Sequence, residues 1–164
     1  MELWELVARE RIRDTLARYS WAGDAFRLAE LALAFCEDGR LEIRAQAPLE
    51  GREAIVTFLG GAFGATGASG DEARRAARRA ETVASGVRRI VRHNLTNVRF
   101  LELAPDRCRV ASYFTVVTEI GLDHCGRYRD TFVPVGDEWL IRHRLVATDW
   151  RAPDSTMAPP ASVT

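Results

Sequence analysis

Four strand-like segments joined by short turns fill the C-terminal half of the chain, and they restrict the possible fold more than any other feature. Their predicted bounds are 91–103, 108–119, 124–135 and 138–149. Each segment is rich in β-branched and aromatic residues. Turns are predicted at Pro105-Asp106, at Gly121-Leu122-Asp123 and at Gly136-Asp137, the last as a tight hairpin. Successive hairpins predict a largely antiparallel sheet.

The first forty residues are predicted to be mainly helical. Apolar side chains recur at roughly helical spacing between residues 3 and 20, and Gly23-Asp24 interrupts the pattern. A second helix is predicted from about Ala25 to Cys36, where Glu37-Asp38-Gly39 is a stop and turn signal. A short strand is predicted at 41–45.

The middle of the chain is predicted to contain a short helix, a loop and a second helix. The short helix covers residues 51–59, and the glycine-rich stretch from Gly60 to Gly70 is predicted to be a flexible loop. An arginine-rich helix is predicted from Asp71 to about Ala84, with acid at its start as the helix dipole prefers. Helices followed by hairpin-linked strands predict an α+β fold, with a curved, mostly antiparallel sheet around the helices and a pocket between them.

Size and composition restrict the class of protein further. The 164 residues suffice for one domain, predicted to span residues 1–151, with a loose tail at 152–164. There are 23 basic and 23 acidic residues, and this balance argues against a nucleic-acid binder. The three cysteines lack a Cys-x-x-Cys spacing, which favours reduced thiols over a disulfide framework. With no signal-peptide pattern and no apolar run near the ~20 residues of a membrane span, we expect a cytoplasmic protein.

The start of the first predicted strand carries the main candidate site. Its sequence is Arg92-His93-Asn94-Leu95-Thr96-Asn97. Regular alternation along a strand places His93, Leu95 and Asn97 on one face, where a histidine and an amide would form the polar floor of a pocket. Two other histidines, His124 beside a turn and His143 between arginines, are expected at the surface. No ligand spacing supports a metal site built from the three histidines.

The order of these motifs resembles the SnoaL-like branch of the nuclear transport factor 2-like superfamily, over roughly residues 5 to 150. The matching stretches are Arg18-Tyr19-Ser20-Trp21-Ala22-Gly23-Asp24 with Phe35-Cys36-Glu37-Asp38, then Gly51-Arg52-Glu53-Ala54-Ile55, then Arg92-His93-x-x-Thr96-Asn97 with Gly126-Arg127-Tyr128-Arg129-Asp130 and Trp139-x-Ile141-x-x-Arg144. The resemblance implies a cone-shaped α+β barrel. Members include polyketide cyclases, scytalone dehydratase, ketosteroid isomerase and a dehydrochlorinase.

The same resemblance implies a catalytic Asp–His pair. In the dehydratase and dehydrochlorinase members, the aspartate that ends the first helix pairs with the histidine of this strand, and Asp24 and His93 occupy those positions. Alignment on Arg27-Leu28 would place Trp21 there instead of Asp24. A carboxylate that orients an imidazole gives a general base near neutral pH. The non-catalytic alternatives are that His93 is a core histidine bound to a backbone carbonyl and that Asp24 caps a helix.

The implied activity is a cofactor-independent lyase, isomerase or cyclase that acts on a small hydrophobic, polycyclic or polyketide-like substrate. Candidate substrate-binding residues are Tyr19, Trp21, Asn97, Tyr113, Thr115, Glu119 and Tyr128. Tyr19 and Trp21 fit a core or a pocket wall equally, Asn97 fits sheet backbone or substrate, and Arg92 fits an ion pair or a substrate clamp. We expect no metal, and a homodimer or homotrimer.

The sequence also allows two hypotheses in which the protein is not an enzyme. The β subunits of aromatic-ring-hydroxylating dioxygenases have the same fold and a similar Arg-His-x-x-x-Asn-Val strand, matched here by Arg92-His93-x-x-x-Asn97-Val98. The chain lacks their proline-containing Tyr-x-x-Pro segment. The other reading is a protein that only binds a hydrophobic ligand.

Overall fold

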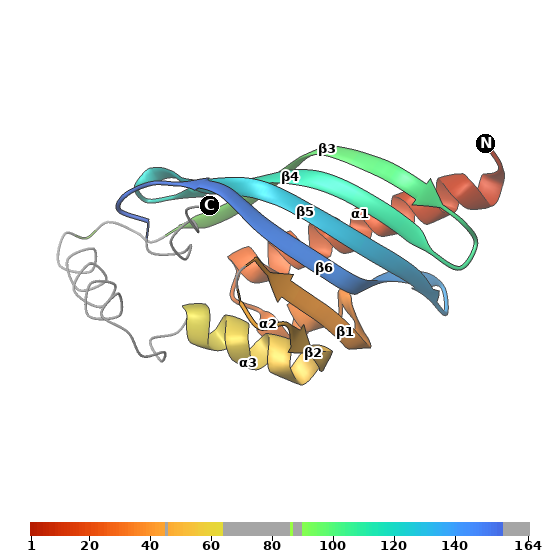
Figure 1. The fold of residues 1–164 in the computed structure, drawn as a ribbon, viewed down its shortest axis with the longest axis horizontal. Coiled ribbons are helices and arrows are strands. Elements are labelled where there is room, and N and C mark those ends of the chain that lie inside the picture. Colours follow the sequence, from red (N-terminus) through yellow and green to blue (C-terminus); the bar gives the residue numbers. More distant parts are fainter. Residues whose placement is uncertain (45, 64–85, 87–89, 156–164) are drawn as a thin grey trace.

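The structure, a computed structural model, describes residues 1–44, 46–63, 86 and 90–155. Its elements are α1 (Leu3–Asp24), α2 (Leu28–Ala32), β1 (Phe35–Ile43), β2 (Leu49–Glu50), α3 (Gly51–Phe63), β3 (Val91–Leu103), β4 (Cys108–Thr118), β5 (Gly121–Val135) and β6 (Glu138–Arg151). The strands form one curved, open sheet in the order β2-β1-β6-β5-β4-β3, and α1 runs along one of its faces (Figure 1). The β1–β6 pair is parallel and the other described pairs are antiparallel. The predicted α+β fold is confirmed.

The four predicted C-terminal strands are present as β3 to β6. β3 has the predicted bounds, and β4 ends one residue early. β5 starts at Gly121, three residues before the predicted start, and β6 runs two residues past the predicted end. The Gly136-Asp137 turn closes the β5–β6 hairpin, with Gly136 at a φ of 59° that suits glycine.

The first helix is anchored by its buried stripe and by one long-range hydrogen bond. Ile12, Leu16 and Tyr19 recur at helical spacing and are buried in the main core cluster. Glu2 and Glu5 form a reciprocal capping box at its start. Thr15 Oγ1 donates to the backbone carbonyl of Trp139 at 2.8 Å, which fixes α1 against the start of β6. The middle of α1 is thereby held against the sheet.

Two predictions about the first forty residues are wrong. The break predicted at Gly23-Asp24 is not among them, because α1 ends at Asp24; a Cβ on Gly23 would lie 3.2 Å from Leu31 Cδ1, so this glycine also allows close packing between α1 and α2. The second helix spans only Leu28–Ala32, since the chain from Phe35 onward pairs with β6. The predicted turn at Glu37-Asp38-Gly39 lies inside β1, at a register shift between Phe35 and Arg40.

Several predicted segments lie wholly or partly outside the described residues. They are the part of the glycine-rich loop beyond residue 63, the arginine-rich helix at 71–84 and residues 156–164 of the tail. The first residues of the predicted tail are held in place. The N–H of Ala152 donates to the Asp123 carbonyl at 2.7 Å, and Ser155 Oγ donates to the Asp123 carboxylate at 2.6 Å. No helix in the described part of the chain is long and apolar enough to cross a membrane.

Candidate active site

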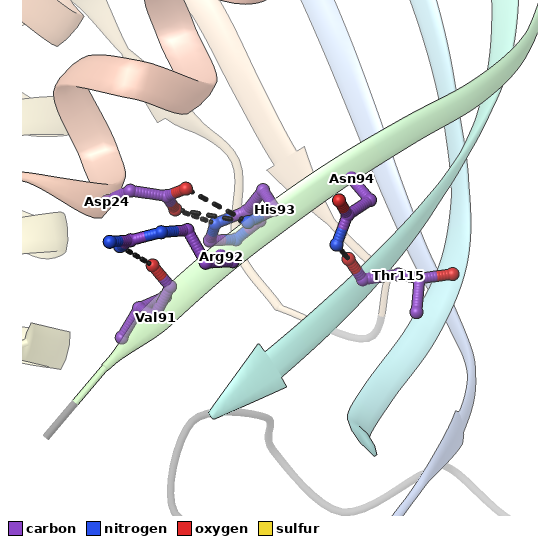
Figure 2. A network of polar contacts seen from close by, with 6 residues as sticks. All are labelled: Asp24, Val91, Arg92, His93, Asn94 and Thr115. Atoms are coloured by element: carbon purple, nitrogen blue, oxygen red, sulfur yellow. Dashed lines mark hydrogen bonds and ion pairs between the residues drawn. The ribbon is translucent and has the colours of Figure 1, made fainter. Parts of the chain in front are cut away.

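The end of α1 and the start of β3 bring Asp24 and His93 into direct contact. His93 Nδ1 lies 2.6 Å from Asp24 Oδ1. The backbone N–H of His93 also points at the same carboxylate, 3.2 Å from Oδ1 and 3.0 Å from Oδ2 (Figure 2). One residue therefore supplies both a ring donor and a backbone donor, and the carboxylate is fixed relative to the imidazole.

The contact leaves the other ring nitrogen of His93 available for chemistry. Because a carboxylate accepts hydrogen bonds, the contact places a proton on Nδ1, and in the neutral imidazole the lone pair then lies on Nε2. Nε2 has no hydrogen-bond partner among the described residues. The side chains of His93 and Asp24 are 13% and 12% exposed, so the pair is sheltered from bulk water and still reachable.

A cavity of about 910 Å³ adjoins the pair, between α1 and the sheet-edge strand β3. This volume is in the range of small-molecule sites. Residues from α1 and from the turn after it line one side: Arg13, Leu16, Ala17, Ser20, Trp21, Asp24, Ala25 and Phe26. The residues on the other side belong to β3 and its approach: Ile90, Val91, Arg92, His93, Asn94, Leu95, Thr96 and Val98. The wall is mostly apolar, with His93 as its one imidazole.

The predicted place of Asn97 beside His93 is wrong. β3 carries a bulge between Thr96 and Arg99, and Asn97 sits in it with a φ of 52°. Asparagine adopts this left-handed conformation more readily than most residues. The extra residue changes the alternation, so Val98 follows Leu95 on the cavity side and Asn97 is exposed.

The three candidates at the end of β4 do not line the cavity. Thr115 pairs with Asn94 and Tyr113 with Thr96, so both lie on the opposite face of the sheet from His93, which pairs with Val116. Tyr113 is 51% exposed there. Glu119 follows β4 and accepts a hydrogen bond from the Ile90 N–H at 3.4 Å. Tyr113 and Thr115 do lie on the predicted strand, but the prediction that their side chains line the pocket is wrong.

The aromatic candidates divide between core and cavity. Trp21, 74% exposed, lines the cavity from α1. Tyr19 and Tyr128 belong to the core, where the guanidinium carbon of Arg144 lies 4.2 Å from both ring centroids. Burial raises the pKa of both phenols, so they stay protonated and cannot act as bases at neutral pH.

A second Asp–His contact lies on β5, where the sequence predicted an exposed histidine. His124 is 8% exposed, and its Nδ1 lies 2.6 Å from Asp123 Oδ1. His124 pairs with Val116, which pairs with His93 on β3. The two histidines thus share one row of the sheet, with Cα atoms roughly 10 Å apart across two strand spacings. The adjacent Asp-His sequence in a strand was the signal that could have revealed this pair.

His124 is held in a cluster that ties the chain end to the sheet. Asp123 accepts hydrogen bonds from Thr118 Oγ1 at 3.3 Å and from Ser155 Oγ at 2.6 Å, as well as from the imidazole. Burial alone would raise the pKa of Asp123, but these three donors and the positive charge that His124 can carry outweigh it and hold the pKa below its usual value. His124 does not belong to the described wall of the cavity.

No group of three or more His, Cys, Asp or Glu side chains in the described ranges could hold a metal ion. The third histidine, His143, is half-buried on β6, where its Nε2 lies 3.2 Å from Glu42 Oε2. The three described cysteines are free, with Cys36 and Cys108 buried.

Residues 4–145 match the family model of the SnoaL-like domain. The chain belongs to the SnoaL-like domain family. This match confirms the predicted resemblance at the level of family and fold. No curated protein matches the chain.

Solved structures of the same fold include three with informative names. A Novosphingobium aromaticivorans protein with the provisional name scytalone dehydratase has 21% identity and a TM-score of 0.67, covering 90% of this chain and 87% of its own. ActVI-ORFA of Streptomyces coelicolor has 17% identity and a TM-score of 0.65, covering 86% and 96%. A Catenulispora acidiphila protein in complex with S-DNPA has 22% identity and a TM-score of 0.61, covering 86% and 92%. At these identities the likeness shows the fold alone.

Proposed function

We propose that this SnoaL-like protein is a cofactor-independent lyase, isomerase or cyclase. In this proposal the Asp24–His93 dyad abstracts a proton from a small polycyclic or polyketide-like substrate. The 2.6 Å contact between His93 Nδ1 and Asp24 Oδ1, at the wall of a mostly apolar cavity, carries the proposal. A general base needs a fixed tautomer and a free lone pair within reach of the substrate. The Asp24 contact at Nδ1 favours one tautomer of His93, and in the neutral ring of that tautomer the lone pair lies on Nε2.

In the proposed reaction, Nε2 of His93 takes a proton from a carbon next to a carbonyl group. The electron pair of the broken C–H bond becomes the enolate, and the imidazole becomes an imidazolium. For dehydration, the enolate expels a β-hydroxyl group, which leaves as water after it takes the proton back from Nε2. For isomerisation, another carbon takes the proton. For ring closure, the carbanion attacks a second carbonyl carbon, and the resulting alkoxide takes the proton.

Asp24 acts by orientation and by charge. Its carboxylate holds the ring with Nε2 towards the cavity and stabilises the imidazolium that forms during proton transfer. The backbone N–H of His93 keeps the carboxylate from rotating away. An amide at this position would remove the negative charge and could present a donor to Nδ1, which favours the wrong tautomer. Asp24→Asn is therefore expected to impair the base with little change in shape.

The names of the structural neighbours agree with this class of chemistry. A provisional scytalone dehydratase and ActVI-ORFA share the fold, and a third neighbour was solved with S-DNPA bound. These names direct the choice of substrates to try. For this chain, the Asp24–His93 contact and the cavity beside it support the proposal.

The test is catalysed proton exchange, which needs no knowledge of the natural product. Hydroxylated tetralones in D₂O provide acidic C–H groups next to a carbonyl, and loss of the corresponding NMR signal reports abstraction. We expect His93→Ala and Asp24→Asn to lower the wild-type rate by roughly 10²–10⁴-fold, the usual contribution of a general base. Circular dichroism and the unfolding midpoint should stay near wild type.

Matched controls change the same residue types away from the cavity. His143→Ala removes a half-buried imidazole paired with Glu42, and Asp149→Asn removes an exposed carboxylate paired with Arg127. Both should keep the wild-type rate. Equal exchange by wild type and His93→Ala would refute the dyad. If the wild type exchanges no tetralone but binds one, the protein is a ligand carrier.

A further inference from the structure

The charges on the cavity wall are unbalanced towards positive. Among the described residues of the wall, Arg13 and Arg92 are the basic ones and Asp24 is the only acidic one. Both oxygens of Asp24 already accept hydrogen bonds from His93, so little of that carboxylate is left for a ligand. Arg13 is partly neutralised at the surface by Glu10, 3.1 Å away. Within the part of the wall that the structure describes, Arg92 is the cation without a carboxylate partner.

Arg92 differs from two other arginines of the same sheet region, Arg127 on β5 and Arg107 in the turn between β3 and β4. Arg127 pairs with Asp149, and Arg107 pairs with Glu102. Arg92 contacts no carboxylate among the described residues. Its Nη1 donates to the Val91 carbonyl at 2.6 Å, which leaves the other guanidinium donors free (Figure 2). An arginine held in this way presents a planar set of donors that suits a carboxylate.

A second polar group in the wall also lacks a partner. Ser20 is 7% exposed and lines the cavity one helical turn before Asp24. Its Oγ is buried without a hydrogen-bond partner. Buried hydroxyls are usually satisfied, and one left unpaired beside a cavity is explained if a ligand supplies the missing bond.

We propose that the cavity binds a small aromatic acid, with its carboxylate on Arg92 and its ring system between α1 and β3. Leu16, Leu95 and Val98 provide an apolar surface for the rings. Arg92 lines the same cavity as His93 and is exposed, so the acid group would lie at the solvent-accessible rim of the cavity. This inference deepens the proposed function by naming the substrate class, and it rests on that function only through the shared cavity.

Binding of naphthoate, compared with the neutral isostere naphthamide, tests the proposal by isothermal titration calorimetry. At about pH 8, where unperturbed histidine is uncharged, we expect wild type to bind the acid at least ~5-fold more tightly than the amide. The preference should shrink in about 0.5 M NaCl, where the screening length is roughly 4 Å. Arg92→Gln should abolish the preference, and Arg92→Lys should retain part of it.

Arg99→Gln is the matched control, because Arg99 is exposed on the same strand but lies outside the cavity wall. It should keep the wild-type preference. Equal affinity for the two probes, or a preference that survives Arg92→Gln, overturns the substrate class while the exchange rates of wild type and His93→Ala still decide the dyad. Absence of binding by both probes overturns the substrate class as well. The two proposals can thus fail separately.

Discussion

Asp24 meets His93 through two donors of a single residue, and this geometry distinguishes the pair from an incidental surface contact. A surface ion pair between long side chains is held loosely and contributes little. Here the acceptor is a short side chain at the end of a helix, and one of its donors is backbone. The imidazole orientation therefore depends on how α1 and β3 pack, and less on side-chain rotamers.

The Asp123 cluster uses the same pair of residue types for a different purpose. Asp123 is 1% exposed and bonds to Thr118, His124 and Ser155, which come from β4, β5 and the segment after β6. An Asp–His contact alone thus does not identify a catalytic base. The cavity beside His93, which does not include His124, separates the two pairs.

Asp123→Asn is expected to destabilise the fold in a pH-dependent way. The pKa of Asp123 is held below its ordinary value of 3.8, so ionisation favours the folded state. The stabilisation is present above pH 3.8 and is lost as the pH falls through the folded pKa. Urea unfolding at neutral pH should show a loss of about 1–3 kcal/mol for the variant. This difference should narrow as the pH falls below about 4; a constant difference would contradict the proposed cause.

At the scale of elements, small irregularities decide which side chains reach the site. The bulge at Asn97 turns β3 so that Val98 and Phe100 follow Leu95 inward. Regular alternation would have put Asn97 there instead. The shift inside β1 similarly accommodates Glu37-Asp38-Gly39 without ending the strand. Such bulges depend on pairing with a neighbouring strand, which local sequence does not show.

Gly126 in β5 is required for close packing between strands. A Cβ on it would lie 2.8 Å from Phe114 Cζ and 2.9 Å from Thr148 Cα. We expect Gly126→Ala to lower the free energy of unfolding by roughly 1–3 kcal/mol, the usual cost of overpacking. Gly136→Ala is not a suitable control, because that residue has a positive φ. Gly60→Ala is the control, because the added Cβ would meet only the flexible end of Leu28, at 3.3 Å from Cδ1; an equal loss in both variants would refute the packing argument.

At the scale of the whole molecule, a buried ion pair joins β5 and β6 beneath α1. Arg144 Nε and Nη2 donate to the two carboxylate oxygens of Asp130 at 2.9 and 2.8 Å, and both side chains are 0% exposed. Tyr19 from α1 and Tyr128 from β5 flank the guanidinium. Burial alone would lower the pKa of Arg144, but the Asp130 carboxylate outweighs it and raises that pKa, so the guanidinium stays charged.

Removal of one partner of this pair should cost more than removal of both. Arg144→Met leaves a buried carboxylate without its partner, and we expect a loss of about 3–5 kcal/mol in denaturant unfolding. The double variant Arg144→Met, Asp130→Leu replaces both charges by apolar groups and should recover most of that loss. A double variant less stable than the single one would show that the pair itself supplies net stability.

The sequence by itself predicted the class of fold and the pairing of Asp24 with His93, which the structure shows as a contact. Turn signals and alternation gave four C-terminal strands close to their true bounds, since hairpins are encoded by neighbouring residues. The match of motifs to a known family selected Asp24 and His93 before their contact was seen.

Tertiary structure alone decided which other side chains share that site. Asn97, Tyr113 and Thr115 were misplaced because a bulge and the facing of β4 are set by pairing between distant segments. The cluster around Asp123 includes Ser155, which is 32 positions away and reaches Asp123 only in the folded chain. The cavity depends on the separation of α1 from β3, which follows from the packing of the whole core.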